Sequence, residues 1–105
     1  MTELPPNALA YKTTPVFTAE TVPKALTRNH HTKPGVWGRI EVFSGALDLT
    51  RFDSNGLAKS HEALWAGESA ICAPGEPHAV TLNATASFSV TFLRVEPAEP
   101  LPERI

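Results

Sequence analysis

The stretch SFSVTF at Ser87–Phe92 decides the fold class, because its apolar and hydroxyl side chains alternate without interruption. A period of two predicts a β-strand with Phe88, Val90 and Phe92 together on one buried face. The segment Val36–Phe43 alternates in the same way, with aliphatic residues on one side and charged residues on the other. The sequence therefore predicts strands rather than helices.

Turn signals recur at the spacing of a sheet protein. Asp53–Gly56 reads DSNG, a hairpin turn in which Asn-Gly accepts positive φ. A helix is expected at most as one turn over Glu20–Leu26, which Pro23 interrupts. Regular turn signals between short strands are typical of sandwiches and barrels. Five glycines mark the strand ends at intervals of 10, 11, 11 and 8 residues: Gly35, Gly45, Gly56, Gly67 and Gly75.

These patterns predict a single all-β domain of roughly eight short strands, which closes most simply as a jelly roll. The 105 residues match the usual length of one domain. Prolines cluster near both ends of the chain, and proline has no N–H for a strand ladder. We therefore expect irregular arms over residues 1 to about 10 and about 96 to 105.

Composition excludes several classes of protein. The net charge is −2 and the nine basic residues are scattered, which argues against nucleic-acid binding. No apolar run approaches the ~20 residues of a membrane helix, and the N-terminus lacks the pattern of a signal peptide. One cysteine, Cys72, excludes an internal disulfide. We expect a cytoplasmic protein with no nucleic-acid partner and no membrane partner.

His78 is the histidine that says most about function. It begins the segment His78–Leu82, where alternation places it on the same face as Val80 and Leu82. A histidine at the inner mouth of a β-barrel can hold a divalent metal through its neutral imidazole. The alternative is a packed histidine whose ring hydrogen-bonds a loop carbonyl.

His30 and His31 are the other candidate metal ligands. Adjacent residues of a strand point to opposite faces, so only one of the two would face inward. In a strand His30 would lie on the same face as Leu26, which slightly favours His30 as the inward-facing residue. Arg28 would lie on that face too. The alternative is an exposed polar loop. Lys33, close by in the sequence, could attract an anion or could simply be solvated.

His61 and Cys72 carry weaker signals. Alternation does not assign His61 to the inner face, and an exposed strand histidine is the simpler interpretation. Cys72 lies in an apolar run and is expected to be a small buried hydrophobe. The chain lacks the Gly-x-Ser-x-Gly, phosphate-loop and dinucleotide-binding patterns.

The chain resembles a cupin. Of the two cupin sequence motifs, the second is the better matched. That motif is Gly, five residues, Pro, one residue, Gly, two residues and His. Gly67, Gly75 and His78 fall at its positions. The proline is displaced by one, so that Ala73 stands in its place and Pro74 follows.

The first cupin motif is only partly matched. Gly45 fits its last position, and counting back from there puts Gly38 where cupins have a glutamate. Of the motif's histidine pair only one is retained, as His30 or His31.

A closer resemblance, to the cupin-like family of tellurite-resistance protein B, covers most of the chain. The family signature His-x-Thr-Lys-x-Gly-x-Trp falls on His30–Trp37 and points to His30 rather than His31 as the equivalent histidine. Longer family members carry a methyltransferase domain, for which this chain has no room. The other matching elements are Tyr11–Phe17, Thr21–Pro23, Gly45 and Pro77-His78.

The resemblance implies a double-stranded β-helix with a small internal pocket, often dimeric. It implies a divalent metal (Zn, Fe, Mn or Ni) at His30 and His78, with water, His31 or a partner residue completing the ligand set. It also implies a small-molecule or oxyanion ligand and a link to tellurite or oxidative stress. Proline-rich arms and the exposed edges of a jelly roll favour a homodimer.

Three functions remain open from the sequence. The first is a cupin-like module that binds a divalent metal or a small ligand in the barrel. The second is a metal-dependent enzyme, an oxygenase or isomerase acting on a small organic substrate. The third is a metal-free scaffold or interaction domain. Fold alone does not choose among the three.

Overall fold

A computed structural model describes residues 3–28 and 30–95 of the chain. Within these ranges the chain forms eight β-strands and one short 3-10 helix, η1. The elements are β1 (Ala8–Thr13), β2 (Phe17–Thr18), η1 (Lys24–Thr27), β3 (Val36–Ser44), β4 (Ala46–Phe52), β5 (Ala58–Trp65), β6 (Ser69–Cys72), β7 (His78–Leu82) and β8 (Ser87–Val95). The predicted all-β class is confirmed.

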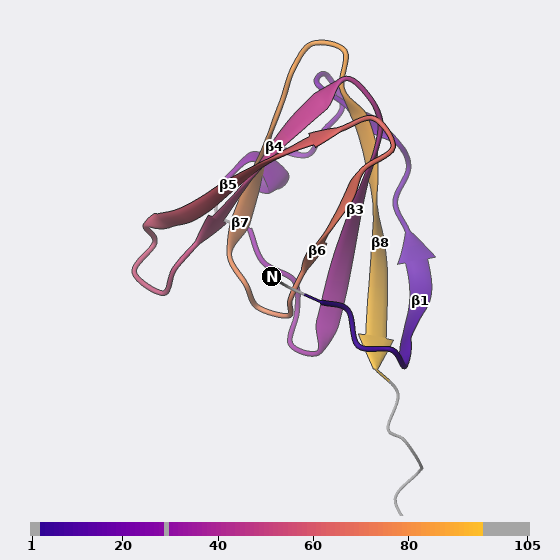
Figure 1. Cartoon of the computed structure of the whole chain (residues 1–105), viewed down its shortest axis with the longest axis vertical. Coiled ribbons are helices and arrows are strands. Elements are labelled where there is room, and N and C mark those ends of the chain that lie inside the picture. The colour runs from indigo at the N-terminus through magenta and orange to yellow at the C-terminus, as the bar shows by residue number, and fades with distance from the viewer. Residues whose placement is uncertain (1–2, 29, 96–105) are drawn as a thin grey trace, which may run out of the picture.

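The strands form two antiparallel sheets (Figure 1). The larger has five strands in the order β1-β8-β3-β6, with β2 also paired to β8, and the smaller has three in the order β5-β4-β7. One apolar core lies between the sheets, because β3 and β8 of the larger sheet and β4 and β7 of the smaller sheet all contribute to it. Its largest fully buried side chains are Phe88, Leu47, Leu49, Val80 and Cys72.

Strand β8 confirms the predicted strand but not the simple alternation of burial. Phe88 and Val90 lie in the core as expected, whereas Ser89 and Thr91 are buried too. The reason is that β8 is an inner strand, paired with β1 and β2 along one side and with β3 along the other. Thr91 is satisfied there by a hydrogen bond between its hydroxyl and that of Thr13 at 3.0 Å.

Gly45 alone separates β3 from β4 and carries the chain from one sheet to the other. Its φ is +64°, and a Cβ at this position would lie 2.5 Å from the backbone nitrogen of Ala86. Both the positive φ and the close approach require glycine.

The β4–β5 hairpin has the predicted turn. Asp53 Oδ1 accepts hydrogen bonds from the N–H groups of Asn55 (2.8 Å) and Leu57 (3.0 Å), and Gly56 has a φ of +81°. The hairpin extends away from the rest of the two sheets (Figure 1), and Leu64 is the one residue of β5 that is buried.

The expected arms need correction at the N-terminal side. Residues Ala8–Ala10 belong to β1 and pair with β8, so the irregular segment is shorter than residues 1–10. The reason is that the prolines stop at Pro6, which leaves Ala8–Thr13 free to donate to the ladder. The C-terminal arm, residues 96–105, lies outside the described residues.

Helix content is as low as the sequence predicts. The 3-10 helix η1 begins directly after Pro23, within the predicted turn, and ends at Thr27. Across the described ranges, no helix has the length and apolarity needed to cross a membrane.

Candidate functional site

His30 and His78 form the centre of the candidate site. Their backbones make an isolated antiparallel bridge, with His30 N–H donating to the His78 carbonyl at 2.8 Å and His78 N–H donating to the His30 carbonyl at 2.7 Å. The ring centroids are 5.5 Å apart, with an interplanar angle of 87°. The tertiary structure therefore brings together the two histidines that the sequence singled out.

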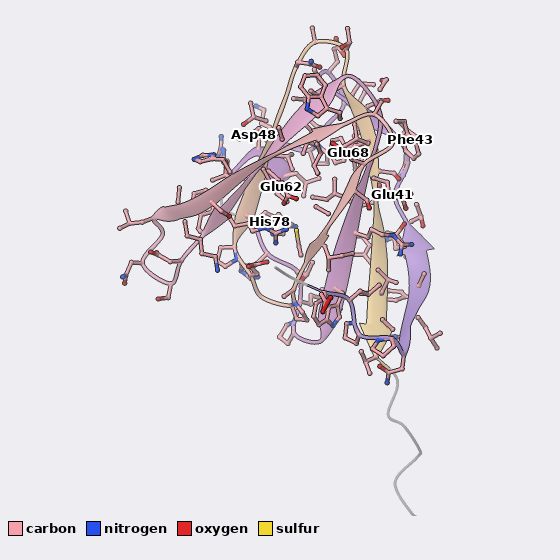
Figure 2. All side chains as sticks on the ribbon, in the orientation of Figure 1. Glu41, Phe43, Asp48, Glu62, Glu68 and His78 are labelled. Atoms are coloured by element: carbon pink, nitrogen blue, oxygen red, sulfur yellow. The ribbon has the colours of Figure 1, made fainter. Side chains whose placement is uncertain are left out.

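His78 is held in one tautomer by the turn that precedes it. The side chain is 4% exposed, and Nδ1 lies 2.9 Å from the carbonyl oxygen of Glu76. A carbonyl can only accept a hydrogen bond, so Nδ1 carries the proton and Nε2 keeps a free lone pair. Figure 2 shows His78 between the two sheets. The prediction that it begins an inward-facing strand is confirmed.

Burial favours the neutral form of both imidazoles. It is the main cause that lowers the pKa of His78, and the hydrogen bond to the Glu76 carbonyl opposes this in part. Burial also lowers the pKa of His30, to which His31 adds a smaller effect. Two neutral imidazoles can bind a metal ion or accept hydrogen bonds from a ligand.

The two histidines line a cavity of about 240 Å³ between the sheets. Apolar side chains such as Ile40, Phe88 and Val90 make most of its wall. The volume lies below the usual 300–1,000 Å³ of drug-sized sites, so the cavity suits a small ligand. Its remaining lining residues are Thr14, Phe17, Pro23, Ala25, Leu26, Thr32, Gly38, Cys72, Val80 and Phe92.

Gly38 of β3 lines the cavity and leaves space in it. A Cβ there would meet Thr32 Cγ2 at 3.7 Å and Val90 Cγ1 at 3.8 Å, which is ordinary contact. The glycine therefore adds volume to the cavity, without being needed for backbone conformation.

The side chain of Thr32 connects two loops at the site. Its buried hydroxyl donates to the Val36 carbonyl at 2.6 Å and accepts a hydrogen bond from the Gly75 N–H at 3.4 Å. These bonds connect the loop that carries His30 to the turn before β7, so they help to hold the two histidines together.

His31 lies apart from the cavity. It is exposed, its Nδ1 lies 3.2 Å from the Thr32 carbonyl, and it lines an outer groove instead. Over the described part of the chain, no set of three or more His, Cys, Asp or Glu side chains is placed to hold a metal ion. The described residues therefore offer a metal two imidazoles, His30 and His78.

Cys72 and His61 have the positions predicted from the sequence. Cys72 is buried against the cavity, and burial is the main cause that raises its pKa to about 11, so it is a thiol in neutral solution. His61 is an exposed residue of β5 whose Nδ1 lies 3.3 Å from Asp48 Oδ2.

Glu76 is a site residue that the sequence analysis missed. Its carbonyl orients His78, and its carboxylate pairs with Arg51 at 2.8 Å and Lys59 at 3.5 Å. Burial alone would raise the pKa of Glu76, but Arg51, the Ala73 N–H and Lys59 together lower it. Its place between Gly75 and Pro77 marked a turn, whereas nothing local in the sequence indicated the distant Arg51.

Comparison with known proteins identifies the family. The family model described as TehB-like domain matches residues 12–90, which is most of the chain. The chain belongs to the TehB-like family. The resemblance noted in the sequence is thereby confirmed.

The curated relatives of this TehB-like chain are much longer than the matched segment. It is 35% identical over 48 residues to the probable S-adenosyl-L-methionine-dependent methyltransferase TehB of Haemophilus influenzae strain Rd, and 33% identical to that of strain 10810. Each match covers 46% of this chain and 17% of the relative.

Two solved structures share the fold of this TehB-like chain. A protein of Escherichia coli strain K12 superposes with a TM-score of 0.85 and 22% identity, over 92% of this chain and 100% of that one. TehB of Haemophilus influenzae superposes with a TM-score of 0.79 and 22% identity, over 86% of this chain and 32% of that one. At this level of identity the likeness concerns the fold alone.

Proposed function

We propose that this TehB-like chain binds a divalent metal ion or a small molecule in the cavity between its sheets. The observation that carries the proposal is the pairing of His30 and His78 at the cavity wall, with ring centroids 5.5 Å apart. Two imidazoles that line one cavity can bind a metal ion or accept hydrogen bonds from a ligand, which supports a binding role.

The proposal includes a cupin-type double-stranded β-helix as the architecture. Two antiparallel sheets with a cavity between them support it, as do the glycines at cupin motif positions. Gly45, Gly67 and Gly75 all have positive φ, which turns at those positions require.

A divalent metal would be held by His30 and His78. The fit is favourable for His78, because the Glu76 carbonyl fixes its tautomer and leaves Nε2 free, a common arrangement around metal-bound histidine. Water or the ligand itself would supply the remaining positions, since His31 lies outside the cavity. Zn, Mn, Fe and Ni all accept imidazole ligands.

The test is metal content of tag-free protein by plasma mass spectrometry after reconstitution with each metal. Near-stoichiometric metal is expected in the wild type, with at least a tenfold weaker affinity in His30→Ala and His78→Ala. His61→Ala is the matched control, because His61 is exposed on β5. Absence of metal from the reconstituted wild type, or equal metal in all variants, would refute the metal site.

The same variants separate the alternatives. A metal-dependent oxygenase or isomerase would also turn over a small organic substrate and stop when the metal is chelated. A scaffold domain would keep all its properties in the His30→Ala and His78→Ala double variant.

We connect this binding with resistance to tellurite, another oxyanion or oxidative stress, on the strength of family membership. Expression in a tellurite-sensitive bacterium should raise the tolerated tellurite concentration for the wild type and not for the double histidine variant. Equal tolerance of the two strains would contradict the connection.

We also propose a homodimer formed along β1. This strand is an edge of the larger sheet and exposes the apolar side chains of Leu9 and Tyr11, whereas β5, an edge of the smaller sheet, exposes the charged side chains of Lys59 and Glu62. Light scattering should give twice the 11.3 kDa chain mass, and Leu9→Lys should lower it. Leu57→Lys in the β4–β5 hairpin is the control, and a monomeric wild type would reject the dimer.

A further inference from the structure

A second hollow, the outer groove, lies next to the cavity and differs from it in chemistry. Its volume is about 390 Å³. Three residues, His30, Thr32 and Phe92, line both the groove and the cavity, so the two spaces adjoin at these side chains. The other residues of the outer groove are Tyr11, Lys12, His31, Lys33 and Val36.

Two lysines, Lys12 and Lys33, line the outer groove. Among residues 3–28 and 30–95, no Asp or Glu lines it. Neither lysine is in an ion pair with any residue that the structure describes. A hollow with two such ammonium groups attracts an anion, even on a chain whose net charge is −2.

A different groove on the molecule shows the contrast. Arg51 and Lys59 line it as well, but Glu62 and Glu76 line it beside them. Arg51 pairs with both carboxylates, at 3.4 Å and 2.8 Å, and Lys59 pairs with Glu76. Those cations are neutralised within the protein, so the outer groove is the better site for an anion.

The cavity has the opposite preference. Its wall is apolar apart from the two imidazoles and a few small polar groups, and none of the described residues that line it carries a charged side chain. A free inorganic anion would lose its hydration there without gaining a cation. An apolar group would instead gain free energy by leaving water.

We propose that the ligand is a small organic carboxylate, with its apolar body in the cavity and its carboxylate on Lys12 and Lys33 in the outer groove. The proposal rests on the proposed function, because the body occupies the same cavity. His30 lies where body and carboxylate meet, and Lys33 thereby acquires a role that the sequence left open.

Titration calorimetry at low salt tests the charge requirement. The probes are phenylacetate and hexanoate, each compared with its neutral alcohol, phenethyl alcohol and hexanol. The acids should bind about tenfold more tightly than the alcohols, because a tenfold ratio needs only ~1.4 kcal/mol from two charge-assisted contacts. Higher salt should weaken binding of the acids and spare the alcohols.

Lysine variants test the position of the carboxylate. Lys12→Gln and Lys33→Gln should each lower the affinity for the acids about threefold to tenfold and leave the affinity for the alcohols unchanged. Lys59→Gln, which removes an ammonium group already paired with Glu76, is the matched control and should change neither.

The outcomes separate this proposal from the proposed function. Equal binding of acid and alcohol, or no effect of either lysine variant, overturns the carboxylate proposal and leaves the cavity as a binding site. A third outcome is that a chelator abolishes binding of the acids while both lysine variants still bind them normally. The carboxylate would then be bound by a metal, and the lysine proposal is overturned as well. Phosphate binding as tightly as the organic acids reduces the groove to an inorganic anion site and overturns the carboxylate proposal. No binding of any probe also overturns it, whereas the metal site at His30 and His78 is decided separately by the metal-content measurement.

Discussion

At the scale of the residue, the chemistry of His78 is decided by burial and by one carbonyl. The Glu76 carbonyl fixes the proton on Nδ1, and the buried position keeps the ring neutral. An exposed histidine such as His61 has neither constraint. The same side chain therefore has a different role at two positions of the chain.

Stability should fall as the pH decreases through the range of the buried histidines. The pKa of His78 and that of His30 are lowered in the folded state from the ordinary 6.5, so the unfolded chain binds more protons below that value. The free energy of unfolding should therefore be level above about pH 7.5 and decrease from about pH 6.5 downwards. Urea unfolding between pH 8 and pH 5 measures this dependence.

His78→Gln provides the control for this pH dependence. The variant should lose a large part of it, because its side chain does not titrate. Wild-type stability that stayed constant or rose on acidification to pH 5 would contradict the assignment of neutral buried histidines.

Gly45→Ala should destabilise the fold by more than Gly56→Ala. Both residues have positive φ, which costs a non-glycine residue ~1 kcal/mol or somewhat more. Only at Gly45 does the added Cβ also meet backbone, 2.5 Å from Ala86 N, whereas nothing lies within 4 Å at Gly56. We expect a loss of about 2–4 kcal/mol at Gly45. Equal losses in urea unfolding would be inconsistent with the close approach.

At the scale of the element, the site depends on contacts between strands and turns. Arg51 of β4 reaches the turn before β7 and pairs there with Glu76. Thr32 makes a second connection, from the His30 loop to Gly75 in the same turn. These two contacts position the turn before β7, and the Glu76 carbonyl of this turn orients His78.

Glu76→Gln should lower the free energy of unfolding by about 1–3 kcal/mol, since a mostly buried Arg51 would lose its nearest charge partner. The two side chains are only 12% and 15% exposed. Glu41→Gln, which breaks the more exposed pair with Arg39, is the control and should cost less than ~1 kcal/mol. Chemical unfolding of both variants at pH 7 measures the two losses of stability. Equal losses would argue against a buried ion pair between Arg51 and Glu76.

At the scale of the whole molecule, the two sheets meet around a cavity that the core does not fill. Leu47 and Leu49 are fully buried and do not line the cavity, whereas Phe88 lines it together with the two histidines. Filling that space should add contacts between the sheets. Under the proposed function, a ligand in the cavity would therefore stabilise the folded protein.

A bound metal or ligand should raise the melting temperature. Binding at 100 times Kd adds about 2.7 kcal/mol, which corresponds to roughly 10–20 °C for a domain of this size. Differential scanning fluorimetry of the wild type with excess zinc, and then with a chelator, should show the rise and its reversal. Under the proposed function, His30→Ala combined with His78→Ala removes the shift. An equal shift in that double variant would place the binding elsewhere.

Several features could be predicted from the sequence because they are local. Alternation in His78–Leu82 places His78 inward, since the pleat of a strand has a period of two. Asn-Gly at the end of β4 predicted the hairpin from backbone preferences alone. Alternation could not predict the buried Ser89 and Thr91, because their burial depends on which strands lie beside β8.

The sequence by itself determined the all-β class, the family and the inward direction of His78, because each depends on short patterns of neighbouring residues. Only the tertiary structure decided that His30 pairs with His78, that His31 faces another groove, and that Lys12 joins Lys33. The physical reason is that these residues come from separate segments. Hydrogen bonding between strands and burial of the shared core bring them together, and neither is a property of the segments alone.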